Sequence, residues 1–114
     1  MNEDHVSTPE DEMLAGALKA LGHPARLAIM RVLAEQSRQC CCGEVTHKLP
    51  LAQSTVSQHL KVLLDAGLIE RHPDGTRNRY CLCSQRIAML RERLGEALDG
   101  LGGITAETTT AKAG

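Results

Sequence analysis

Three consecutive cysteines, Cys40, Cys41 and Cys42, stand directly before Gly43 in this sequence of 114 residues. Soft ions such as As(III), Sb(III), Cd(II) and Pb(II) prefer thiolate ligands, and trivalent arsenic forms a pyramidal site with three sulfurs. Neighbouring residues on an α-helix point about 100° apart, so a regular helix cannot direct all three thiols at one ion. A metal or metalloid site at the triplet therefore requires a local bend of the backbone.

The same thiols permit other interpretations. Vicinal cysteines can form a disulfide, a persulfide or a sulfenic acid under oxidant, which predicts a redox sensor. Free Cys also buries readily as a small apolar residue, although three neighbours are awkward to bury on one core. We do not expect an enzyme with cysteine nucleophiles, because the sequence contains no Cys-X-X-Cys pair.

Two further thiols, Cys81 and Cys83, are additional candidate metal ligands. They alternate with Tyr80 and Leu82 in a predicted strand, so both cysteines should lie on one face of it. Cys also suits a half-buried strand without any metal. The five cysteines are an odd number. Together with the reduced thiols expected in the cytosol, this argues against a disulfide framework and favours metal or redox chemistry.

Apolar residues at helical spacing predict the elements that position these thiols. The predicted helices span residues 12–21, 24–35, 43–49, 54–66 and 84–98. Pro24 suits the first turn of the second helix, and Pro50 separates the third helix from the fourth. Two helices thus meet at a tight turn before residue 54.

A β-hairpin is expected over residues 68–83, with a turn through Pro73, Asp74 and Gly75. The last predicted helix follows it and carries one apolar stripe: Ile87, Leu90, Leu94 and Leu98. Such a stripe can pair with the same helix of a second subunit. The expected fold is mainly α with a β-hairpin wing (α+β), a dimeric winged helix-turn-helix.

The helix over residues 54–66 has an apolar face and an opposite face rich in Ser, Thr and Gln, which suits the major groove of DNA. Gln can bond adenine bidentately, Ser and Thr can bond bases or phosphates, and Lys and Arg can neutralise phosphates. The candidate DNA-binding residues are Gln53, Ser54, Thr55, Ser57, Gln58, His59, Lys61, Arg77 and Arg79. The alternative is that this polar face simply contacts water.

Length and charge set the remaining bounds. The chain leaves room for one domain with an aliphatic core, because it has no Trp or Phe and a single Tyr. Residues 1–12 carry five acids, whereas residues 19–93 hold twelve Lys or Arg against six Asp or Glu. We expect a disordered acidic arm over 1–11, one DNA-binding and dimerisation domain over 12–99 and a disordered tail over 100–114. No apolar run is long enough to span a membrane, so a cytoplasmic protein is expected.

The sequence resembles the ArsR/SmtB family of metal-responsive repressors. The strongest stretches are LKALGHPARLAIMRVL, LAQSTVSQHLKVLLDAGLIERH and GTRNRYCL, which begin at Leu18, Leu51 and Gly75. The resemblance implies a dimeric winged-helix repressor of the arsenic-responsive type. Such a repressor binds double-stranded operator DNA at an inverted repeat and leaves when a metal, a metalloid or an oxidant occupies its thiols.

The resemblance also bears on the inducer. Arsenic and cadmium sensors of the family commonly carry a Cys-X-Cys pair in the corresponding helix, where Cys41 matches the first Cys and Gly43 occupies the second place. The family's other metal site, on the last helix, has no counterpart between Ser84 and Asp99. As(III) or Sb(III), with Cd(II) or Pb(II) next, is therefore the expected inducer, and no organic cofactor is implied.

Overall fold

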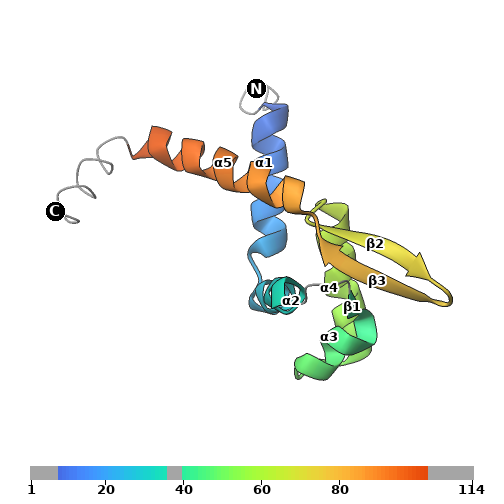
Figure 1. Cartoon of the computed structure of the whole chain (residues 1–114). Coiled ribbons are helices and arrows are strands. Elements are labelled where there is room, and N and C mark those ends of the chain that lie inside the picture. Colours follow the sequence, from blue (N-terminus) through green and yellow to red (C-terminus); the bar gives the residue numbers. More distant parts are fainter. Residues whose placement is uncertain (1–7, 36–39, 103–114) are drawn as a thin grey trace, which may run out of the picture.

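The computed structural model describes residues 8–35 and 40–102 as five helices and three strands in a mainly helical arrangement (Figure 1). The helices are α1 (Pro9–Leu21), α2 (Pro24–Glu35), α3 (Cys42–Lys48), α4 (Gln53–Asp65) and α5 (Ser84–Leu101). The strands are β1 (Cys40–Cys41), β2 (Ile69–Asp74) and β3 (Arg77–Leu82). This order of helices followed by a hairpin confirms the expected winged helix-turn-helix.

The first helix begins earlier than expected. We placed its start at Glu12, but α1 starts at Pro9, because Thr8 caps it: the Thr8 Oγ1 accepts a hydrogen bond from the Asp11 N–H at 3.1 Å. Three acids in the first turn interact favourably with the helix dipole. Residues 9–11 are thus helical and do not belong to a disordered arm. Residues 1–7 of that expected arm lie outside the described residues.

The last helix is longer than expected. α5 continues through Gly100 to Leu101, two residues into the predicted tail, and the N–H of Gly102 bonds to the Leu98 carbonyl. The remainder of the tail, residues 103–114, lies outside the described residues. Within the described part of the chain, no helix is long and apolar enough to cross a membrane.

Helix α4 ends in a glycine cap. Gly67 has a positive φ of 76°, its N–H bonds to the Leu64 carbonyl, and the Leu68 N–H bonds to the Leu63 carbonyl. This pair of bonds is a Schellman motif. Leu63 and Leu68 are both fully buried, so the cap also directs the chain from α4 back through the core into β2.

The hairpin forms with a two-residue turn. Asp74 pairs with Arg77, and Gly75 at the first turn position has a φ of 66°, as a type II′ turn requires. β1 was not expected: it pairs antiparallel with β3 and gives a three-stranded sheet in the order β1-β3-β2. A two-residue strand is too short to show a period, which explains why the sequence did not reveal it.

The core lies where α2, α3, α4 and the base of the hairpin meet. Its largest fully buried side chains are Ile29, Leu60, Leu63, Leu68, Val45 and Val56. Burial of each such side chain stabilises the fold by roughly 1.5–3 kcal/mol. α5 crosses α1 and contributes no fully buried residue, although Ile87 and Leu90 pack against the core (Figure 1). The core therefore fixes α4 relative to the hairpin.

Candidate nucleic-acid interface and thiol site

The polar face of α4 is turned outward because its apolar face is used by the core. Val56, Leu60 and Leu63 are buried, whereas the side chains of Ser54 and Gln58 are exposed. Gln53 and Ser57 are also exposed, and Thr55 is half-buried. Ala52, the residue before α4, makes no side-chain cap hydrogen bond. The start of this helix thus presents exposed side chains on one surface.

Lys61 extends from the same helix and is paired only loosely. Its Nζ lies 3.4 Å from the Asp65 carboxylate one turn later, and the two side chains are 76% and 68% exposed. An exposed pair of this kind contributes at most about 1 kcal/mol. Lys61 can therefore exchange Asp65 for a phosphate at little cost.

His59 is directed at the body of the protein. It is half-buried, its ring centroid lies 4.7 Å from that of His23, and its Nδ1 lies 3.4 Å from Nη1 of Arg26. Burial, then the neighbouring His23 and Arg26, lowers the pKa of His59. These contacts connect His59 of α4 to Arg26 of α2, and the contact of His59 with DNA stays a prediction.

Arg26 and His23 hold the corner between α1 and α2. The Arg26 Nε donates to the Ala20 carbonyl at 2.6 Å, and the His23 Nδ1 accepts from the Ala25 N–H at 3.1 Å. The corner is thus tied to the last turn of α1, to the first turn of α2 and, through His59, to α4. Sequence reasoning assigned no role to Arg26, because its partners lie on other elements.

The two wing arginines differ in their surroundings. Arg77 is exposed next to the turn. Arg79 is tied to two carboxylates: its Nε donates to Asp74 at 2.7 Å, and its Nη1 lies 3.8 Å from Glu44 of α3. Glu44 was missed by the sequence analysis, since only the fold brings α3 to the wing. Arg77 is thus the more accessible of these two arginines for a phosphate.

The backbone changes conformation within the cysteine triplet. Cys40 and Cys41 lie in β1, opposite Tyr80 and Arg79 respectively, and Cys42 is the first residue of α3. The triplet therefore does not lie within one regular helix. The triplet also stands at the junction of the sheet and the helix-turn-helix, which the sequence did not indicate.

Cys81 and Cys83 are free, half-buried thiols. The Sγ of Cys81 lies 4.0 Å from Oε1 of Glu70 on the neighbouring strand. Burial, then Glu70 and Cys83, raises the pKa of the Cys81 thiol. The register places β1 beside the strand that carries Cys81, with Cys41 opposite Arg79, two residues away from Cys81. Along the chain, Cys81 is therefore closer than Cys83 to Arg79, the residue that pairs with Cys41.

Comparison with known proteins identifies relatives of this chain. Residues 23–71 match the family model described as bacterial regulatory protein, arsR family. The chain is 39% identical over 77 residues to the arsenical resistance operon repressor of Bacillus subtilis, covering 67% of this chain and 72% of that protein.

Solved structures agree on the fold. An ArsR-like transcriptional regulator from a Rhodococcus species superposes with a TM-score of 0.74 at 19% identity, covering 91% of this chain and 96% of that one. The homodimeric winged helix-turn-helix DNA-binding domain of a possible ArsR-family regulator from Mycobacterium bovis superposes with a TM-score of 0.66 at 22% identity, covering 89% and 91%.

Proposed function

The chain belongs to the ArsR family of regulatory proteins, whose members compared above are transcriptional regulators and not enzymes, and we propose that it is a homodimeric, thiol-controlled repressor of transcription. Its inducer is As(III) or Sb(III), bound by thiolates of Cys40, Cys41 and Cys42. The observation that carries the proposal is the exposed polar face of α4, which packs against α3, the helix that begins at the cysteine triplet beside the hairpin.

DNA binding follows from the shape and chemistry of α4. The start of the helix enters the major groove, where Gln53, Ser54 and Gln58 reach base edges. Thr55, Ser57 and Lys61 contact bases or phosphates, and Arg77 at the wing tip contacts backbone or minor groove. A dimer then reads two half-sites of an inverted repeat about one helical turn apart.

The dimer interface is formed by α1 and α5. Their exposed apolar side chains include Met13, Met89 and Leu98, which are 46%, 38% and 57% exposed in the single chain. A groove of about 250 Å³ between the two helices is lined mainly by apolar residues such as Leu14 and Leu90. A second copy would cover these side chains, and the similar domain from Mycobacterium bovis is a homodimer.

The position of the triplet supports a route from inducer to DNA. Three thiolates suit a pyramidal As(III) or Sb(III) site, and softer divalent ions such as Cd(II) or Pb(II) accept the same donors. An ion held by the triplet would act on the pairing of Cys41 with Arg79 and on the start of α3, because the triplet contains residues of both elements. The wing and the helix-turn-helix then shift together. A coupling of about 1 to 3 kcal/mol suffices to release the operator.

Fluorescence anisotropy of the reduced protein on its promoter DNA tests the proposal, with titrations of arsenite, antimonite, cadmium and peroxide. We expect arsenite or antimonite to release the wild type and the Cys83→Ser control from the DNA. A Cys40/Cys41/Cys42→Ser variant should stay bound to the DNA. Release by peroxide alone would replace the metalloid inducer by the redox sensor considered above. Absence of DNA binding by the reduced protein would refute the repressor itself.

A further inference from the structure

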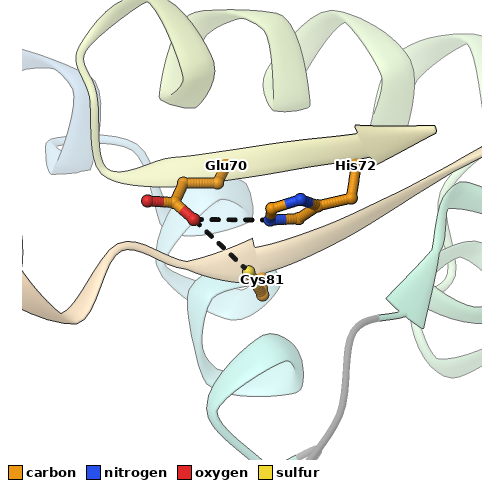
Figure 2. A group of neighbouring side chains, drawn as sticks. All are labelled: Glu70, His72 and Cys81. Carbon is orange, nitrogen blue, oxygen red and sulfur yellow. Dashed lines mark hydrogen bonds and ion pairs between the residues drawn. The ribbon is translucent and has the colours of Figure 1, made fainter.

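Three side chains with metal-binding atoms converge on the face of the wing that is turned away from the buried Ile69 and Tyr80: Glu70, His72 and Cys81 (Figure 2). The His72 Nε2 lies 3.3 Å from the Glu70 Oε1, and the Cys81 Sγ lies 4.0 Å from the same oxygen. One ligand atom from each residue lies within 4.8 Å of the others. We propose that these three residues form a separate site for a borderline divalent cation such as Zn(II).

The hairpin register assembles this group. Glu70 and Cys81 are direct partners across β2 and β3, and His72 follows Glu70 by two residues, so strand alternation brings all three to one face. The register is fixed by the buried residues on the opposite face and by the short turn. The ligands are therefore held close together before any ion binds, which lowers the entropic cost of binding.

The donor set and the spacing fit Zn(II). Thiolate, imidazole and carboxylate are its protein ligands, and a tetrahedral ion with the usual bond lengths separates N from O by about 3.3 Å and S from O by about 3.6 Å. The observed 3.3 Å matches the first value, and the observed 4.0 Å exceeds the second by about 0.4 Å, so the Cys81 Sγ must move toward the other two ligand atoms, which lie within 4.8 Å of it. Water would complete the tetrahedron, and coordination releases the Cys81 thiol proton to solvent.

The surroundings tolerate a cation. Arg79 lies opposite His72 on the same strand pair, and its charge would repel an ion. However, Arg79 is already engaged by Asp74 and Glu44, so its charge is largely offset. His72 and Glu70 are 46% and 52% exposed, which leaves the site open to solvent for entry of the ion. The competing explanation is that the group is held together only by the contact of His72 with Glu70, in which case Cys81 binds no ion as a thiolate.

Co(II) chloride is the probe, because a bound thiolate gives a sulfur-to-Co(II) charge-transfer band. The titration uses the full reduced chain in the Cys40/Cys41/Cys42→Ser background, so that a signal cannot arise from the triplet. We expect a thiolate band at one equivalent of Co(II), and competition of Co(II) by Zn(II). His72→Gln and Cys81→Ser should each weaken binding by more than the roughly 10- to 100-fold typical of residues behind the ligands. Cys83→Ser should leave the band unchanged.

The outcomes separate clearly. Absence of a thiolate band in the triplet variant overturns the site, as does a band that persists in Cys81→Ser or an unchanged Co(II) affinity in His72→Gln. Circular dichroism of each variant shows that a lost band does not reflect a lost fold. The proposal is independent of the inducer at the triplet: it can hold when arsenite fails to release DNA, and it can fail when arsenite succeeds.

Discussion

Arg79 of the wing and Glu44 of α3 form an ion pair, with 3.8 Å between Nη1 and Oε1. Arg79 lies opposite Cys41 in the sheet, and Glu44 follows Cys42 by two residues in α3. The pair therefore bridges the two elements that meet at the cysteine triplet. A pair this exposed adds about 1 kcal/mol or less to stability, so its effect should lie in the transmission of movement.

Glu44→Gln should reduce the coupling between arsenite and DNA and leave folding stability within about 1 kcal/mol of the wild type. The coupling is the ratio of the operator dissociation constants with and without arsenite, typically about 5- to 150-fold. We expect a several-fold lower ratio in anisotropy titrations. Glu35→Gln, at the exposed end of α2, is the control. An unchanged ratio in Glu44→Gln would exclude this bridge as part of the route.

Gln58→Ala should reduce the preference for the operator over a mutated site by about 1–3 kcal/mol, because Gln58 is exposed on the outer face of α4. The measurement is anisotropy on the operator and on single-base variants at one salt concentration. Gln85→Ala, exposed at the start of α5, should leave the preference intact. If Gln58→Ala retains full discrimination, the assigned recognition face is wrong.

The stability of the protein should fall as the pH is lowered through 6.5. Burial, then His23 and Arg26, lowers the pKa of His59 below its ordinary value of 6.5. Between the lowered value and 6.5 the unfolded chain binds more protons at this site, so stability rises with pH there and is complete above 6.5. Urea unfolding from pH 5 to 8 measures the free energy of unfolding, which should change less with pH in His59→Gln than in the wild type. His47→Gln, an exposed site on α3, should keep the wild-type contribution of His59.

Gly67→Ala should destabilise the fold by about 1–2 kcal/mol, since residue 67 has a φ of 76°. A Cβ at this position would also stand 2.7 Å from Nη1 of Arg86, which reaches the Ala66 carbonyl at 3.5 Å. Gly16→Ala, in the middle of α1 with nothing within 4 Å, should instead stabilise by about 1 kcal/mol. Denaturant midpoints measure both, and equal shifts of the same sign would contradict this account of the α4 cap.

Leu98→Ser should weaken the proposed dimer. Leu98 is 57% exposed in the single chain, and loss of the burial of this exposed part in both subunits costs about 2–3 kcal/mol, or about 30- to 150-fold in the dissociation constant. Sedimentation velocity at several concentrations measures this constant. Leu27→Ser, at an exposed leucine of α2, serves as the matched variant and should remain dimeric. If Leu98→Ser keeps the wild-type dissociation constant, the end of α5 is not part of the dimer interface.

The sequence by itself determined the helices and the hairpin. α2 spans the expected Pro24–Glu35, and the other predicted helix boundaries lie within three residues of the observed ones, because helical period, proline and glycine act over a few neighbouring residues. The start of α1 was placed late because its cap at Thr8 precedes a turn of acidic residues without an apolar period. The family resemblance rested on the same local patterns and is confirmed.

Only the tertiary structure decided how the chemical groups meet. The pairing of Cys41 with Arg79, the contact of Arg79 with Glu44 and the turning of His59 toward Arg26 each join residues more than thirty positions apart. The group of Glu70, His72 and Cys81 depends on which residues of two strands stand opposite each other. Local propensity carries no information about such register, because the register is set by the shared burial of distant side chains in one core.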